Sequence, residues 1–241
     1  MATDTREDRL DCCELTSAVE DYLKAIYHLS VEQDPVTTSA IADRVQVAPP
    51  SVSAMLRRLR GSSLVSDDAG RTVALTDHGR RHALRIIRRH RLLETFLAEV
   101  LDVPWDEVHV EAERLEHALS DPLEERIARK LGHPTHDPHG DPIPPRDGGH
   151  DESWPEPLDA VPAGMRFRVE RVSDRDSEAL RYLADLGVRP GAVLAVGERA
   201  PFGGPLWVDL RGRSQALGIP LARLVHGRVL AAGDTESASE H

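Results

Sequence analysis

The nine residues 109–117, HVEAERLEH, constrain this chain more than any other stretch. Residues three or four apart share one face of an α-helix, so a helix here would carry two imidazoles and two carboxylates along one side. Those side chains belong to His109, Glu113, Glu116 and His117. Carboxylates beside a neutral imidazole make a site for a divalent first-row metal. The same residues also fit the solvated face of an amphipathic helix, so the rest of the chain must decide.

Length and composition indicate a multidomain protein of the cytoplasm. The 241 residues can form two or three domains, each with its own core. No apolar run approaches the roughly 20 residues that span a bilayer, and the charged N-terminus lacks the apolar region of a secretory signal. Cys12 and Cys13 are adjacent and have no other cysteine to pair with, which favours a reducing compartment. We therefore expect no membrane partner.

Charge is unevenly distributed along the chain. The overall net charge of −11 argues against a nucleic-acid partner. Between residues 35 and 91, however, eleven arginines face four aspartates, so this segment carries +7 and the remainder −18. A basic segment in an acidic protein is the electrostatic signature of a phosphate-binding module.

The first third of the chain has the pattern of a winged helix-turn-helix. Capping signals and helical spacing predict helices at about 17–31, 39–45 and 50–61, and short strands at 64–66 and 72–75 around a turn at 67–70. The helix that begins at Pro50 would enter the major groove. Its leading residues are Ala48, Pro49, Pro50, Ser51 and Ser53, and the phosphate-binding candidates are Arg57, Arg58, Arg60 and Arg71 of the wing. A module used only for protein contacts is the alternative, which the local charge of +7 disfavours.

Three further helices are predicted between residues 76 and 132. Thr76 caps a long helix to about Leu101, on which His90 and Glu94 form a second chelating pair four residues apart. The next helix, opened by residues 102–105, carries the stretch 109–117. A last helix begins with 120–122 and ends at Gly132, with Leu123, Ile127 and Leu131 expected inward. Such helices after a DNA-binding module supply a dimer interface.

The C-terminal half contains a linker and a small β domain. Residues 133–160 are rich in Pro, Gly, His and Asp, and the scattered histidines have no helical register, so we interpret them as part of a solvated linker. Alternation from Met165, a helix at 177–186 and strand-like runs at 193–196, 206–210 and 224–230 predict a small SH3-like barrel. The last nine residues have the composition of a disordered tail.

The expected fold class is therefore mainly α with a small amount of β. It comprises an N-terminal winged helix-turn-helix DNA-binding domain at 1–76, an α-helical metal-binding and dimerisation domain with a proline-rich linker at 77–150, and a C-terminal SH3-like β-barrel at 160–232.

The segments HRLLE, EVHVEAERLEH and DPHGDPIP, in this order after a helix-turn-helix, resemble the diphtheria-toxin-repressor family of metal-dependent regulators. The resemblance implies two metal sites per chain, a homodimer and metal-activated binding to a palindromic DNA operator. It implies one site made of His90, Glu94 and His109 and completed from the SH3-like domain. The other would use Asp21, Glu113, Glu116 and His117.

The ligand types favour manganese. Iron-responsive members of the family carry a Met and a Cys at the positions of Asp21 and Glu113. Carboxylates suit Mn²⁺, whereas sulfur improves binding of metals further along the Irving–Williams order. The chain is thus similar to the three-domain manganese-responsive branch, which implies a repressor of metal-uptake genes with Mn²⁺ as cofactor. Lys24 stands where some two-domain manganese regulators carry a second carboxylate, which disfavours a closely bridged two-metal centre of their type and makes the three-domain layout the better analogy. An Fe²⁺-dependent repressor is the alternative.

The residue that completes the first site from the SH3-like domain is expected in the segment VSDRDSEAL. Asp174 and Asp176 are the candidates, and Asp174 is favoured because Asp176 suits the N-cap of the following helix. The alternative is that both aspartates only cap.

Two functions of other classes are alternatives. A metal-dependent hydrolase would use the same His and Glu clusters, but no separate nucleophile or phosphate loop accompanies them in the sequence, so no enzyme activity is expected. A metal-independent regulator that senses a small organic ligand would bind its operator after EDTA treatment. We expect neither.

Overall fold

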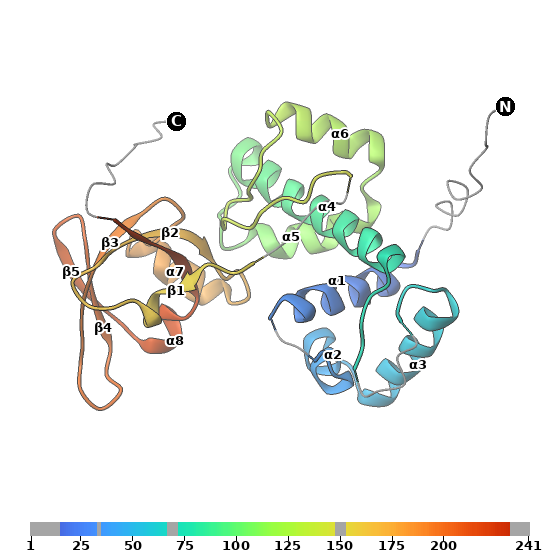
Figure 1. The fold of residues 1–241 in the computed structure, drawn as a ribbon. Helices are drawn as coiled ribbons and strands as arrows, with labels where there is room; N and C mark the ends of the chain where they lie inside the picture. Colours follow the sequence, from blue (N-terminus) through green and yellow to red (C-terminus); the bar gives the residue numbers. More distant parts are fainter. Residues whose placement is uncertain (1–14, 33–34, 67–71, 148–152, 232–241) are drawn as a thin grey trace. The chain divides into compact units, whose positions relative to one another are not determined.

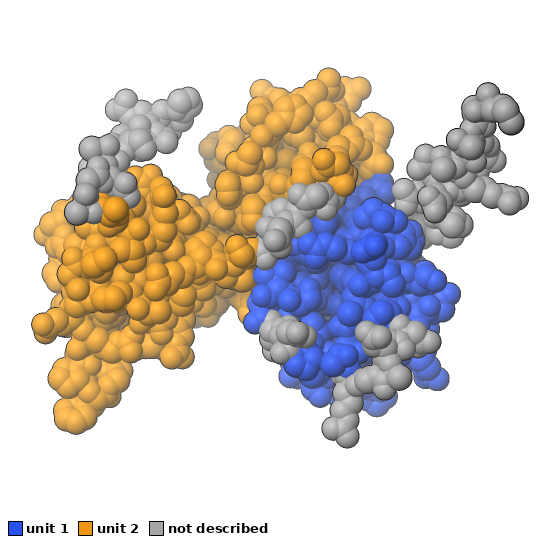
Figure 2. Space-filling model, viewed as in Figure 1, with its two compact units in different colours: residues 1–86 blue, residues 87–241 orange. Residues whose placement is uncertain are grey.

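A computed structural model describes residues 15–32, 35–66, 72–147 and 153–231 of the chain. The chain divides into two compact units, residues 1–86 and 87–241 (Figure 2). The boundary falls within the long helix α4. Cys12, Cys13, Arg71, the wing turn at 67–70 and the C-terminal tail lie outside the described residues.

The first unit contains the three predicted helices of the DNA-binding domain. They are α1 (Ser17–Glu32), α2 (Thr38–Val45) and α3 (Pro49–Gly61) (Figure 1). Thr37 caps α2, because its Oγ1 accepts a hydrogen bond from the backbone N–H of Ala40 at 3.2 Å. Of the predicted wing strands, the described residues form a single antiparallel bridge between Val65 and Leu75. Apolar side chains of all three helices make the core, including Leu23, Ile26, Tyr27, Ile41 and Leu59.

The second unit begins with a helical domain, here residues 87–147. Its helices are the second part of α4 (Asp77–Leu101), α5 (Val108–Leu115), the 3₁₀ turn η2 (Glu116–Ala118) and α6 (Asp121–Lys130). Thr76 caps α4 as predicted, since its Oγ1 accepts from Gly79 N–H at 3.0 Å. Leu92, Leu97, Val108, Ala112 and Ile127 share one buried cluster. The prediction that Leu123 points inward is wrong, because this side chain is exposed.

The predicted solvated linker is in part a packed segment. Asp137, His139, Asp141 and Ile143 are all buried. Two arginines of α4 hold the backbone of this segment: Arg91 Nη1 donates to Pro142 O at 2.6 Å and Arg88 Nη1 to Pro144 O at 2.8 Å. Buried carbonyl groups need such donors, and the sequence of the segment alone does not reveal them.

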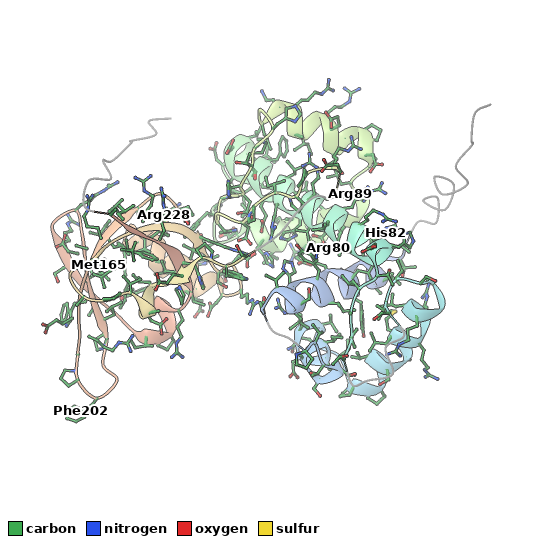
Figure 3. The ribbon with its side chains drawn as sticks, viewed as in Figure 1. Arg80, His82, Arg89, Met165, Phe202 and Arg228 are labelled. Atoms are coloured by element: carbon green, nitrogen blue, oxygen red, sulfur yellow. The ribbon has the colours of Figure 1, made fainter. Side chains whose placement is uncertain are left out.

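An SH3-like domain, residues 156–230, completes the second unit. Its six strands form one antiparallel sheet in the order β1-β6-β2-β3-β4-β5 (Figure 1). The elements are β1 (Glu156–Pro157), η3 (Leu158–Ala160), β2 (Arg166–Val172), α7 (Ser177–Asp185), β3 (Val193–Arg199), β4 (Leu206–Leu210), β5 (Arg213–Leu217), α8 (Ile219–Ala222) and β6 (Val225–Leu230). Phe167 and Val169 of β2 face the core, as their alternation predicted. The fully exposed Phe202 marks the tip of the hairpin between β3 and β4 (Figure 3).

Within the described residues, no helix has both the length and the apolar character that crossing a membrane requires.

Candidate metal centre

Four of the predicted ligands meet in one cluster of the second unit. His90 and Glu94 lie one turn apart on α4, His109 is on α5, and Asp174 is in the connection between β2 and α7. Glu94 Oε1 lies 3.0 Å from His90 Nε2 and 3.2 Å from His109 Nδ1. Asp174 Oδ2 lies 3.0 Å from the same His109 nitrogen. We call these four residues the first cluster.

The charges of the first cluster suit a cation. Burial would raise the pKa of Glu94, but the His90 charge and hydrogen bonds from His109 and His90 hold it well below its usual range. Burial would likewise raise the pKa of Asp174, and its hydrogen bond and charge interaction with His109 lower it instead. Burial would lower the pKa of His109, yet hydrogen bonds to Asp174 and Glu94 raise it to about 11. A protonated imidazole thus holds the two carboxylates together where a metal ion would do the same.

Metal binding at the first cluster is expected to release about one proton at pH 7, because an imidazole must be neutral to ligate. His109 supplies that proton, since its pKa is about 11, whereas Glu94 and Asp174 are already ionised. Affinity should therefore rise with pH, roughly tenfold per unit, until the pH reaches the pKa of His109. Calorimetry of Mn²⁺ binding in two buffers of different ionisation enthalpy measures the proton count. Equal heats in both buffers would contradict the assignment.

His139 is a further potential ligand that the sequence interpretation missed. Its side chain is fully buried, and its Nε2–H donates to the carbonyl of Trp105 at 2.7 Å. In the neutral ring this tautomer leaves the lone pair on Nδ1, which lies 3.8 Å from Glu94 Oε1. His139 Nδ1 and Glu94 Oε2 are buried and lack a hydrogen-bond partner among the described residues. Two buried atoms without such a partner at this cluster fit a bound cation. The motif DPHGDPIP, which contains His139, was the sequence signal that could have identified this ligand.

A second group of carboxylates forms where α5 ends. The interpretation of 109–117 as one continuous helical face is wrong, because α5 ends at Leu115 and Glu116 begins the tighter 3₁₀ turn η2. Glu116 is fully buried and its Oε2 lies 2.5 Å from His90 Nδ1. Glu113 groups with His90 and Glu116 as a possible metal ligand. The Nε2 atom of His117 lies 3.6 Å from Glu116 Oε1. We call Glu113, Glu116 and His117 the second cluster.

The structure separates the roles of the remaining predicted ligands. Asp176 caps α7, since its Oδ1 accepts from the backbone N–H groups of Glu178 and Ala179 at 3.0 and 3.1 Å. Asp174, by contrast, is the one in contact with His109. Asp21 is on α1 in the first unit, and its membership of the second cluster stays a prediction.

The predicted DNA-binding residues of α3 lie on its solvent-exposed side, with Val52, Leu56 and Leu59 buried on the other. Ala48, Pro49, Pro50, Ser51, Ser53, Arg57 and Arg58 are exposed, and Arg60 is half-buried. The local charge needs a correction, because four of the eleven arginines make ion pairs with other residues of the chain. These are Arg44 with Glu32, Arg88 and Arg89 with Glu124, and Arg91 with Asp141 (Figure 3 labels Arg89). The count of +7 therefore overstates the charge that this segment can offer to DNA.

Comparison with known proteins covers nearly the whole chain. Three family models match: "Iron dependent repressor, N-terminal DNA binding domain" at residues 14–70, "Iron dependent repressor, metal binding and dimerisation domain" at 76–145, and "FeoA domain" at 156–229. The iron-dependent repressor IdeR of Mycobacterium tuberculosis is 36% identical over 79% of this chain and 88% of its own length.

Solved structures of manganese regulators are similar to the chain as well. A manganese-dependent transcriptional repressor in complex with manganese is 43% identical, with a TM-score of 0.82 over 88% of this chain and 100% of the other. The manganese regulator SloR is 31% identical, with a TM-score of 0.74 over 90% of this chain and all of the other.

Proposed function

The chain belongs to the diphtheria-toxin-repressor family of metal-dependent transcriptional repressors, and on this premise we propose that Mn²⁺ activates it. As a homodimer in the cytoplasm it would bind a palindromic operator and repress metal-uptake genes. It is not an enzyme, in agreement with its repressor relatives, and both its family and its fold class were correctly predicted. We further propose the domain boundaries at 76, 150 and 160 that the sequence predicted.

The chemistry of the donors carries the choice of metal. Every potential ligand atom of the two clusters is a carboxylate oxygen or an imidazole nitrogen. Asp21 and Glu113 add carboxylates where sulfur would favour Fe²⁺. An Fe²⁺-dependent repressor is the second candidate, which the 36% identity to an iron-dependent repressor favours. The similar structure with bound manganese supports the first.

The chain's own residues indicate how metal and DNA binding are coupled. Asp21 belongs to the unit that carries α3, whereas Glu113, Glu116 and His117 belong to the other unit. A cation shared by these residues would offset their mutual repulsion and tie the two units together. The two α3 helices of the dimer, which would enter the major groove, would then keep a separation near one DNA turn, about 34 Å. A coupling of roughly 1–3 kcal/mol is typical of such population shifts.

Exposed apolar side chains on the helical domain support the homodimer. Leu101, Val110, Leu115 and Leu123 are all exposed in a single chain. Apolar surface of this kind is stabilised when a second copy covers it.

The decisive experiment is operator binding titrated with Mn²⁺, Fe²⁺ and Zn²⁺, and in EDTA. Activation by Mn²⁺ at the lowest concentration supports the proposal, and preferential activation by Fe²⁺ supports the second candidate. Full binding in EDTA would instead point to a metal-independent regulator.

The exposed arginines of α3 are expected to bind phosphates. Arg57→Ala or Arg58→Ala should weaken all DNA sequences alike and reduce the salt dependence of binding by about one unit per lost contact. Binding isotherms at several salt concentrations, for operator and random DNA, measure both effects. Arg129→Ala, an exposed arginine of α6, is the control and should leave the slope unchanged. Altered sequence preference with an intact slope would show that the residue reads bases.

A further inference from the structure

Two sequence motifs of the helical domain contact the SH3-like domain. One is VPW at residues 103–105, between α4 and α5, and the other is DPHGDP at residues 137–142. Both motifs belong to the same compact unit as the SH3-like domain. Their contacts explain how Asp174 reaches a cluster whose other members are helical.

Trp105 of the helical domain packs into the core of the SH3-like domain. It is buried in the same hydrophobic cluster as Phe167 of β2. The guanidinium of Arg189 lies 4.6 Å above its ring, a cation–π contact from the SH3-like side. Next to it, the buried Asp106 accepts a hydrogen bond from Arg181 of α7 at 2.9 Å.

The turn at 137–142 makes backbone contact with β2. The N–H of Val172, at the end of β2, donates to the carbonyl of His139 at 2.8 Å. Gly140 has a φ of +87°, and a Cβ there would lie 1.9 Å from the carbonyl oxygen of Glu170. Only a glycine allows both this backbone conformation and this approach.

Side chains reinforce the same contact. Asp141 accepts from Arg91 of α4 at 3.0 Å and also from Arg171 of β2, so one buried carboxylate joins the two domains. The Arg171 guanidinium also lies 3.2 Å from the ring centroid of Trp154. A buried carboxylate with two guanidinium partners is costly to separate from either of them.

The two contacts are connected to each other and to Asp174. His139 Nε2–H donates to the carbonyl of Trp105, so the turn and the VPW motif hold one another. Asp174 follows Val172 by two residues, and the intervening Ser173 N–H donates to Leu224 O at 2.8 Å. The backbone is therefore fixed immediately before the side chain that contacts His109.

We propose that Trp105 and the 137–142 turn form a latch that holds the SH3-like domain on the helical domain without metal, and so position Asp174 in the first cluster. Every contact of the latch joins protein groups, which is why docking needs no cation. Only the effect on metal affinity rests on the proposed function. Trp105 and Gly140 are positioning residues that act through Asp174.

Hydrogen exchange of the metal-free full-length chain tests the latch. In wild type, the amide of Val172, which donates to His139 O across the contact, should already be protected without metal. Gly140→Ala should speed its exchange at least tenfold, because the added Cβ meets β2, and saturating Mn²⁺ should restore part of the protection. Gly132→Ala is the matched control, since Gly132 has a φ of +74° but nothing within 4 Å of an added Cβ. It should leave exchange of the Val172 amide unchanged.

A second set of three variants gives an independent readout. Trp105→Ala should weaken Mn²⁺ binding at the first cluster roughly tenfold, as groups that orient ligands do, and leave the second cluster unaffected. Trp105→Phe should restore most of the affinity, and Trp207→Ala, at an exposed site on β4, should change nothing.

Fast exchange of the Val172 amide in metal-free wild type, slowed only by Mn²⁺, would overturn the latch. So would equal exchange in the two glycine variants. Protection without metal in a chain that binds no Mn²⁺ would support the latch and refute the proposed function, so the two failures are distinguishable.

Discussion

Glu94→Gln is expected to lower the Mn²⁺ affinity of the first cluster at least 100-fold, equivalent to about 2.7 kcal/mol. Glu94 is fully buried and its Oε1 lies within 3.2 Å of nitrogens of both His90 and His109. Gln keeps the shape of the side chain but removes the negative charge that a cation requires. It also removes one of the two carboxylates that raise the pKa of His109, and the easier deprotonation of that ring offsets part of the loss. Ligand loss, rather than a packing defect, therefore dominates the effect.

Calorimetry should then count one fewer tight Mn²⁺ per chain, with the second cluster still occupied. Glu99→Gln is the matched control, because Glu99 is an exposed residue on the same helix. Circular dichroism of both variants checks that α4 remains folded. Unchanged stoichiometry and affinity in Glu94→Gln would mean that the first cluster is only a buried ion-pair network.

Local sequence signals predicted the helical scaffold of the site. The spacing of His90 and Glu94 fixes both on one face of α4, and the cap at Thr76 fixes where that helix begins. These features depend on residues at most a few positions apart, so the local sequence is sufficient to predict them. The alternation of Phe167 and Val169 identified β2 for the same reason.

Features that depend on distant partners were missed. The buried state of His139 follows from contacts with Trp105 and Val172, each more than 30 residues away in the chain. Its neighbours Pro138 and Gly140 have the composition of a linker, and composition cannot show that Arg91 holds the segment. The strand β5 was missed because its first three residues, RSQ, are polar, and its pairing with β4 defines it.

The arginines of the basic segment likewise have two roles, internal ion pairing and phosphate binding, which a count of charges cannot separate. Arg88 and Arg89 bind Glu124, whereas Arg57 and Arg58 stay exposed on α3. The first pair stabilises the packing of α6 on α4, and the second is available to phosphates. Only the positions of the partners distinguish them.

Asp21→Met combined with Glu113→Cys is expected to shift activation from Mn²⁺ toward Fe²⁺ by about tenfold or more, at least 1.4 kcal/mol. Both substitutions replace a hard oxygen donor with a softer sulfur, while Glu116 and His117 stay in place. Sulfur strengthens binding further along the Irving–Williams order, so affinity for Fe²⁺ should rise relative to Mn²⁺.

The measurement is operator binding at graded free Mn²⁺ or Fe²⁺ under anaerobic conditions, with the preference expressed as the ratio of half-saturating concentrations. Asp21→Met with Glu111→Cys is the matched control, because Glu111 is also on α5 but pairs with Arg114 instead of joining a cluster. If the Glu113 variant shifts the ratio more than the control does, the donor atom at position 113 helps set the choice of metal. A ratio unchanged from wild type would assign selectivity to the geometry of the clusters, with hard and soft donors tolerated alike.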